Sequence, residues 1–386
     1  MTRIAGRAQV GQAALLLAAV LLLGAGTGLA AARWTAGVGQ VSLLAVADDG
    51  TTVAADKTAN KAVLLTGATG AAAWEYPGRG DQISGVGITA DGSRIILSES
   101  QVVKPQTELT QDRLVMLDRD GRVMWEQLAQ GRARISAQGR YLLTYDREHD
   151  FGLRVLAAQD GGTLWEAPRE QLGQMEAASF SRDGEHVLVQ AANRVTLFSA
   201  RGERLWAMGF PAGVRDAATS ASGEVTAILL GGSSRRLVLV DRSGKTLLNR
   251  QLLRRPEGAP ANWEYGDWEA VAVPGDGRQV VLQGYLPGRY ELQMLDITGK
   301  LLWDRTVPKP DSSASLQMLG GKLICLTVET EQATQLHLFD AAGKARPPVE
   351  LPGASACAVA ANGRFASLAA GATVQSLALP GADPAP

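Results

Sequence analysis

The chain has 386 residues, of which 46% are hydrophobic and 20% charged, and its 38 Lys+Arg and 39 Asp+Glu give a formal net charge of −1. This composition excludes a disordered or collagen-like chain, and the balanced charge provides no field for holding nucleic acid. Glycine is costly inside regular elements, so the 44 glycines beside only 5% aromatic residues must be concentrated in turns.

The first element along the chain is predicted to be an export segment. Arg3 and Arg7 precede a stretch without charge, residues 8–32, whose most apolar part covers residues 13–24. Positive charges before an apolar segment predict that the following chain is extracytoplasmic. Two outcomes stay open: cleavage near Ala32, where small residues follow the apolar part, or anchoring in the membrane by residues 8–32, which are long enough to span a bilayer. No Cys lies near this segment, so we expect no lipid attachment there.

Two series of glycines recur along the remaining chain. Tight hairpins need a positive φ, which Gly provides, and a neighbouring Asp or Asn bonds the turn backbone. The runs between the glycines, such as GVGITADGSRIILSES at residues 85–100, are short and lack helical spacing, so they predict strands. The first series follows a strand with D-x-x-G or a degenerate copy, at Gly70, Gly121, Gly161, Gly202, Gly244, Gly299, Gly343 and Gly381. The second series lies between two apolar runs, at Gly50, Gly92, Gly139, Gly184, Gly223, Gly277, Gly321 and Gly363.

Each repeat of about 40 to 55 residues therefore holds two hairpins, which is the pattern of a four-stranded β-propeller blade with strands A to D. Eight glycines in each series predict an all-β, eight-bladed propeller over residues 33–386, after an export segment at residues 1–32. A seven-bladed alternative would leave one pair of glycines unused. The last repeat lacks its outer strand, so we expect the N-terminal strand near Trp34 to join the C-terminal blade and close the ring.

The outer strands also carry most of the tryptophans. The segments LVMLDRDGRVMW (residues 114–125) and LQMLDITGKLLW (residues 292–303) resemble the quinoprotein-type, or PQQ-like, propeller repeat. The A–B halves look more like those of WD-type and TolB-type propellers. The resemblance implies that the outer-strand tryptophans pack between neighbouring blades. These structural residues are Trp34, Trp74, Trp125, Trp165, Trp206 and Trp303.

The resemblance implies little about function, because propellers host enzymes, ligand binders and scaffolds. Enzymatic quinoproteins resemble one another in a vicinal Cys pair and a calcium cluster, whereas Cys325 and Cys357 are far apart in this sequence. We therefore identify no ligand for PQQ or Ca²⁺, and no catalytic or metal motif occurs. The two cysteines are either small buried hydrophobic residues or, in an oxidising compartment, a disulfide between neighbouring blades.

Two insertions interrupt the repeat on the face where the B–C and D–A connections emerge. Residues 99–112 lengthen the second blade, and residues 253–269 lengthen the connection between the fifth and sixth blades. Exposed loops with Arg and aromatic residues are typical of interfaces. The alternative is that these aromatic residues fold back and cover the junction between blades five and six. The candidate interaction residues are Arg254, Arg255, Trp263, Tyr265, Trp268 and Lys104.

The sequence thus predicts an exported, non-enzymatic propeller that acts as a scaffold or sensor for a protein or another envelope component. No nucleic-acid partner is expected, and the membrane is a partner only if the N-terminal segment is uncleaved. The alternative function is a PQQ-like oxidoreductase or a small-ligand-binding propeller.

Overall fold

A computed structural model describes residues 32–104, 109–129, 132–145, 152–232, 235–252, 267–286, 289–319 and 321–379. Of the predicted export segment, only Ala32 belongs to these ranges. No helix within them is long and apolar enough to cross a membrane.

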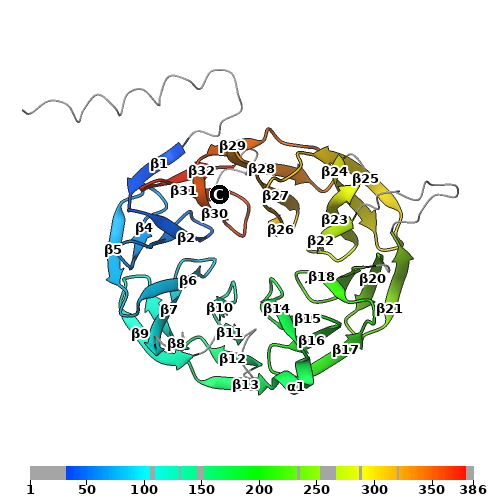
Figure 1. The fold of residues 1–386 in the computed structure, drawn as a ribbon, viewed down its shortest axis with the longest axis horizontal. Coiled ribbons are helices and arrows are strands. Elements are labelled where there is room, and N and C mark those ends of the chain that lie inside the picture. Colours follow the sequence, from blue (N-terminus) through cyan, green and yellow to red (C-terminus); the bar gives the residue numbers. More distant parts are fainter. Residues whose placement is uncertain are drawn as a thin grey trace, which may run out of the picture.

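Eight antiparallel sheets of four strands each surround a central opening (Figure 1). The chain passes outward through each blade from the innermost strand, A, to the outermost strand, D. This arrangement confirms the eight-bladed propeller. Blades one to four contain β2 (Val41–Val46), β3 (Thr52–Asp56), β4 (Lys61–Leu65) and β5 (Ala72–Pro77); β6 (Gln82–Ile88), β7 (Arg94–Lys104), β8 (Leu109–Asp118) and β9 (Val123–Ala129); β10 (Arg132–Ile135), β11 (Tyr141–Tyr145), β12 (Leu153–Ala157) and β13 (Thr163–Ala167); β14 (Met175–Phe180), β15 (His186–Ala191), β16 (Arg194–Ser199) and β17 (Arg204–Gly209).

A short helix, α1 (Arg169–Leu172), lies in the connection between blades three and four. The remaining blades repeat the same order, except that blade eight takes its outer strand from the start of the chain. Blades five to eight contain β18 (Val214–Thr219), β19 (Val225–Leu230), β20 (Arg236–Asp241) and β21 (Thr246–Gln251); β22 (Asp267–Ala272), β23 (Gln279–Leu286), β24 (Arg289–Asp296) and β25 (Leu301–Val307); β26 (Ala314–Leu319), β27 (Leu323–Glu329), β28 (Ala333–Asp340) and β29 (Val349–Pro352); β30 (Ala354–Val359), β31 (Phe365–Ala370), β32 (Thr373–Ala378) and β1 (Ala32–Gly37).

The ring closes through strands from opposite ends of the described chain. Strand β1 pairs antiparallel with β32, with Gly37 opposite Thr373 and Ala36 opposite Val374. In Figure 1, the blue β1 lies against the red strands of blade eight. The predicted closure by the strand around Trp34 is therefore confirmed, and blade eight has the same four strands as the others.

The glycine series explain the hairpins. All eight A–B glycines and seven of the C–D glycines have positive φ, while Gly381 lies beyond the described residues. In a complete D-x-x-G copy, Oδ1 of Asp118 accepts hydrogen bonds from the backbone N–H groups of Asp120 and Arg122, both at 2.9 Å. Two residues therefore specify the turn. Gly adopts the left-handed backbone conformation, and the Asp carboxylate accepts hydrogen bonds from the backbone N–H groups of the turn.

Apolar contacts between neighbouring blades form the core. Strands β15 and β19 are buried at every residue. One cluster joins Leu237 and Leu239 of blade five to Val280 and Leu282 of blade six. Burial of such middle strands on both faces provides the main hydrophobic stabilisation of the ring.

Six outer-strand tryptophans lie against the C–D glycine of the following blade. A Cβ added to Gly121 would lie 2.7 Å from Cγ of Trp74, so the indole occupies the space that a side chain would fill. Nε1 of Trp74 donates a hydrogen bond to the carbonyl oxygen of Arg119 in the same turn at 3.0 Å. The six pairs are Trp34–Gly70, Trp74–Gly121, Trp125–Gly161, Trp165–Gly202, Trp206–Gly244 and Trp303–Gly343.

Candidate functional site

The predicted interaction residues fall only partly within the described chain. Arg254, Arg255, Trp263 and Tyr265 lie outside it. Lys104 is the last residue of β7, where its backbone pairs with Leu109, and its side chain is not among those described.

Trp268, the remaining loop candidate, lies in the core. Its side chain is 3% exposed and packs in the cluster that joins Leu237 of blade five to Leu282 of blade six. This position corresponds to the packing alternative, in which aromatic residues cover the junction between blades five and six. The indole of Trp268 is therefore not presented to a partner.

The insertion of blade two is a projecting β-hairpin. Strands β7 and β8 continue their pairing through Gln101 opposite Gln111 and Val102 opposite Thr110. The outer strand β9 pairs no further than Asp112, so the ribbon extends beyond the edge of its blade. Val102, at the start of the extension, is 44% exposed. The hairpin emerges on the face of the B–C and D–A connections, called here the connection face.

The innermost strands share a feature at the end that opens on this face. In six of the eight blades, the second or third residue of strand A is a β-bulge, seen as a register shift between its two neighbours. A bulge re-aims a side chain, and five of the six side chains are exposed while Glu269 is half-buried. These residues lie on the innermost strands of their blades, at the ends nearest the connection face. The bulge residues are Ser42, Ser84, Glu176, Arg215, Glu269 and Ser355.

The six residues divide into two arcs. Ser355, Ser42 and Ser84 occupy blades eight, one and two, and we call them the serine arc. Glu176, Arg215 and Glu269 occupy blades four, five and six and form the charged arc. Blades three and seven show no register shift between their A and B strands and separate the arcs.

The serine arc is tied to the backbone. Ser84 Oγ donates to the carbonyl oxygen of Ser98 at 3.3 Å, and Ser355 Oγ donates to that of Val41 at 3.1 Å. These hydroxyl groups therefore join strands within a blade and across the closing junction. The charged residues among the six bulges all belong to the charged arc.

Glu269 is held by a buried relay on blade six. The Tyr290 hydroxyl donates to Oε2 of Glu269 at 2.5 Å, and Nε2 of Gln283 donates to the Tyr290 hydroxyl at 2.6 Å. Burial, followed by the bond to Glu269, raises the pKa of Tyr290, so the phenol stays a neutral donor. Gln283 is 1% exposed, and its Oε1 has no hydrogen-bond partner within the described residues.

The other two charges of the arc are differently placed. Neither the Glu176 carboxylate nor the Arg215 guanidinium forms an ion pair with any residue of the described ranges. Behind them, Oδ2 of Asp216 accepts the backbone N–H of Val271 at 2.8 Å, which links blade five to blade six. Burial raises the pKa of Asp216, so its carboxylate is a structural group rather than an accessible charge.

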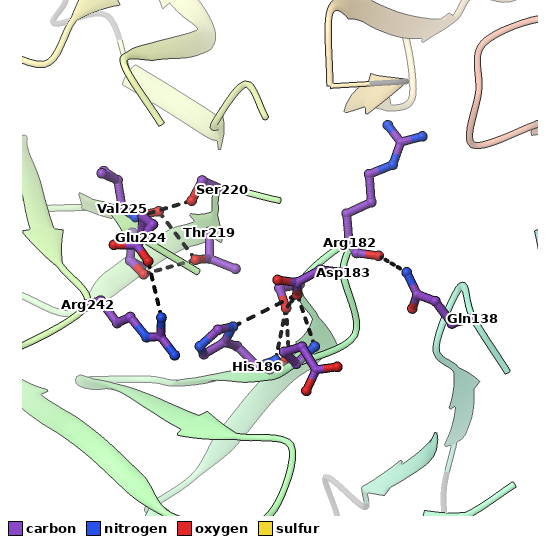
Figure 2. Close-up of polar contacts among 12 residues, drawn as sticks. Gln138, Arg182, Asp183, His186, Thr219, Ser220, Glu224, Val225 and Arg242 are labelled. Atoms are coloured by element: carbon purple, nitrogen blue, oxygen red, sulfur yellow. Dashed lines mark hydrogen bonds and ion pairs between the residues drawn. The ribbon is translucent and has the colours of Figure 1, made fainter. Parts of the chain in front are cut away.

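The opposite mouth is narrowed by contacts between A–B turns. The backbone N–H of Asp48 donates to the carbonyl oxygen of Ala90 at 2.7 Å, and that of Asp183 donates to Ala221 at 3.0 Å. Figure 2 shows Gln138 reaching from blade three to the carbonyl oxygen of Arg182 in blade four, at 2.9 Å. A cavity of about 430 Å³ remains there. Its lining residues are Asp48, Ala90, Asp91, Ala137, Gln138, Arg182 and Ala361.

A buried histidine lies beside these turns. The His186 side chain is 2% exposed, and neither ring nitrogen has a hydrogen-bond partner in the described chain. Nδ1 is 3.9 Å from Oδ1 of Asp183, as drawn in Figure 2, and the ring lies against Gly223 of the next blade. Burial lowers the pKa of His186, so the ring is neutral in the folded protein at neutral pH.

The described residues were compared with the requirements of a metal site and of a reactive thiol. These ranges contain no group of three or more His, Cys, Asp and Glu side chains that could hold a metal ion. Cys325 and Cys357 are free thiols, and burial raises the pKa of each to about 12. Cys325 is buried and Cys357 half-buried, and thiols with a raised pKa form little reactive thiolate, which corresponds to the hydrophobic interpretation of the pair.

The sequence analysis did not single out the charged arc. Glu176 is the only charge of β14, whereas β18 also holds Asp216 and β22 also holds Asp267, and none of these charges matches a motif. A usable signal was present, because each bulge residue lies at the same distance before the A–B glycine of its blade. Comparison of the repeats at that position would have collected all six residues.

Comparisons with known proteins agree with the fold. The family model described as outer membrane protein assembly factor BamB matches residues 80–208 and 110–285. The structure is similar to BamB from Moraxella catarrhalis, with a TM-score of 0.59 and 15% identity over 91% of this chain and 100% of that chain. It is also similar to Chaetomium thermophilum Sqt1 bound to the N-terminus of the ribosomal protein L10, with a TM-score of 0.61 and 11% identity over 91% and 100% of the two chains.

A structure described as the eukaryotic initiation factor gives a TM-score of 0.51 at 10% identity, covering 81% of this chain and 88% of that chain. No curated protein matches this chain in sequence. At such low identity, the likeness to the solved structures concerns the fold alone.

Proposed function

Because the chain belongs to the BamB-like family of PQQ-type β-propeller repeats, we propose that it is an exported, non-enzymatic scaffold that binds a protein of the cell envelope. The family description, outer membrane protein assembly factor, supports a role in assembling or organising other proteins. The uncharged stretch at residues 8–32 supports export, with the propeller either anchored by it or released after cleavage near Ala32.

The observation that carries the proposal is the asymmetry between the two faces of the disc. On the connection face, the hairpin of β7 and β8 projects from blade two, and the charged arc lines the mouth at blades four to six. On the opposite face, the A–B turns bond one another and narrow the opening. Elaborated connections on a rigid scaffold are where binding residues concentrate, so the connection face is the proposed interface.

We assign the first contacts to the connection that precedes β22. Arg254, Arg255, Trp263 and Tyr265 have the side-chain types of interface anchors, and Lys104 lies on the hairpin of blade two. Trp268 belongs to the core between blades five and six and serves packing instead.

The proposal is tested by capture from the native envelope with the tagged full-length protein. Variants Trp263→Ala and Arg254→Glu are compared with the unmodified chain. Arg242→Glu is the matched control, because Arg242 is exposed and lies near the opposite mouth, where it pairs with Glu224 at 3.2 Å (Figure 2). We expect a specific partner to be lost with the first two variants and retained with the control. Equal recovery with all variants would contradict the proposed interface.

The enzymatic alternative has its own experiment. Calorimetry of the purified protein with PQQ and Ca²⁺ is expected to give no stoichiometric heat, because no ligand set for either is identified. Binding of one PQQ per chain would overturn the non-enzymatic assignment.

A further inference from the structure

We infer that the charged arc recognises a polypeptide segment of mixed charge, in which a basic side chain pairs with Glu269 and an acidic side chain pairs with Arg215. This inference rests on the proposed function and specifies the chemistry of the partner. It concerns the mouth of the channel, and not the connection before β22.

The charged arc is built on bulges of the backbone. A bulge disrupts the ladder of its strand, and bulges near functional sites re-aim side chains. Three neighbouring blades use this device at Glu176, Arg215 and Glu269, on their innermost strands at the connection face. The three blades across the mouth use the same device for serines, so the geometry of the bulge does not itself require charge.

Buried hydrogen-bond partners hold the Glu269 carboxylate in place. Binding residues are positioned by buried partners, whereas an ordinary surface carboxylate is solvated and mobile. The Gln283 amide and the Tyr290 hydroxyl form a relay that ends on Oε2 of Glu269. Tyr290 is 3% exposed, so the relay approaches the carboxylate from inside the blade. The unpartnered Oε1 of Gln283 leaves a further buried acceptor in this relay.

Two charges of the arc have no ion-pair partner within the described residues. Glu176 and Arg215 lie on adjacent blades but not within ion-pair distance, and neither pairs with another described residue. Along the arc the charges are negative, positive and negative. The two glutamates would repel a simple anion, and Arg215 would repel a simple cation. A ligand with complementary charges would form charge-assisted hydrogen bonds at both Arg215 and Glu269.

An extended polypeptide meets this requirement. Side chains on one face of an extended segment recur at every second residue, so basic and acidic groups can alternate along the innermost strands of three blades. The projecting hairpin of blade two lies on the same face. A single zwitterionic small molecule would reach fewer of the three blades, and it is treated as an alternative outcome of the test.

The experiment uses the full-length protein and fluorescent synthetic peptides at low ionic strength. One peptide alternates lysine, serine, glutamate, serine and lysine, and two others replace either the lysines or the glutamate with glutamine. Fluorescence anisotropy is expected to show saturable binding of all three peptides, tightest for the mixed peptide and weaker for each peptide that lacks one kind of charge. Glu269→Gln and Arg215→Gln should each weaken that binding about tenfold, as expected for loss of a charge-assisted contact.

A coupling measurement excludes a merely structural effect. Glu269→Gln should not weaken further the peptide that lacks lysine, and Arg215→Gln should not weaken further the peptide that lacks glutamate. Tyr290→Phe, which removes the positioning hydroxyl, should weaken only peptides with lysine. Ser42→Ala and Ser355→Ala are the matched controls on the serine arc and should bind like the unmodified protein. Thermal unfolding of each variant verifies its folding.

The results separate this inference from the proposed function. Equal binding of the mixed peptide by the unmodified protein and both neutral variants would overturn the inference. Full competition by free lysine or glutamate would replace the peptide with a small zwitterion and would also overturn it. If the envelope partner is captured but ignores arc substitutions, the scaffold function stands and the arc assignment fails. If peptides bind as expected but no partner is captured, the arc assignment stands and the scaffold function fails.

Discussion

Nε1 of Trp34 donates a hydrogen bond to the carbonyl oxygen of Gly67 at 2.9 Å and thereby joins blade eight to blade one. Trp34 is 7% exposed and lies in β1, the strand that completes blade eight. We expect Trp34→Ala to lower the free energy of unfolding by about 3 kcal/mol, because a large buried side chain is lost at the closing junction. Urea unfolding measures the change.

Leu164→Ala is a suitable control for that measurement. Leu164 also lies in an outer strand but is 50% exposed, so its removal should change the free energy of unfolding by less than about 1 kcal/mol. Equal losses for the two variants would show that the contact of Trp34 does not secure the ring.

A second prediction compares two tryptophans in the same structural position. Trp165 Nε1 donates to the carbonyl oxygen of Ala200 at 2.8 Å, whereas Nε1 of Trp206 has no partner among the described residues. Trp165→Phe should therefore cost about 1 kcal/mol more than Trp206→Phe, since only the first substitution removes a hydrogen bond. Chemical denaturation of both variants tests the order, and a larger loss for Trp206→Phe would contradict it.

A third prediction concerns the glycines beneath these indoles. A Cβ on Gly202 would lie 2.7 Å from Cγ of Trp165, whereas a Cβ on Gly353 would meet nothing within 4 Å. Both residues have positive φ, so Ala at either site carries the same kind of backbone strain. Gly202→Ala should lower the melting temperature clearly more than Gly353→Ala, because it also displaces the indole. Similar shifts in differential scanning calorimetry would contradict the close contact.

A fourth prediction concerns pH. Burial lowers the pKa of His186 below its ordinary value of 6.5, so below about pH 6.5 the unfolded chain takes up a proton that the folded chain does not. Stability should therefore fall as the pH decreases through this region. Arg242 reinforces the effect, while Asp183, Glu185 and Glu224 oppose it.

His186→Leu removes this linkage with a side chain that blade seven carries at the same turn position, Leu323. Between about pH 7.5 and pH 5, the variant should lose less stability than the unmodified protein, because it lacks the proton uptake of His186 on unfolding. Urea unfolding at both pH values provides the measurement. Parallel losses in the two proteins would show that the pKa of His186 is the same in the folded and unfolded chain.

Much of the fold follows from local patterns in the sequence. The A–B and C–D glycines locate the hairpins because only a left-handed residue makes these turns short, and Asp118 supplies the expected carboxylate. The missing outer strand of the last repeat required a replacement, which β1 provides. The hairpins depend on residues close in sequence, and the ring closure depends on the number of strands. Both can be predicted from a repeated pattern in the sequence.

The features that the sequence did not reveal depend on contacts between blades. The bulges occur with glutamate, arginine and serine alike, so no residue type specifies those at Glu176, Arg215 and Glu269. The insertion of blade two carried no sign that β7 and β8 would extend through it. Trp268 was grouped with the preceding loop, although it lies in β22 and packs in the core. Sequence proximity cannot distinguish an exposed loop residue from a buried residue at the start of the next strand.

The pairing of β1 with β32 also sets an order of assembly. Strand β1 is made first, yet its ladder partner is the last strand of the described chain. Blade eight therefore cannot form before the other seven blades have been synthesised, whatever sequence of events those blades follow. Until then, β1 and the flank of blade one remain an open edge that is exposed to misassembly. Completion of the disc is thus a property of the whole chain rather than of any repeat, because the closing ladder joins the first and last strands of the described chain.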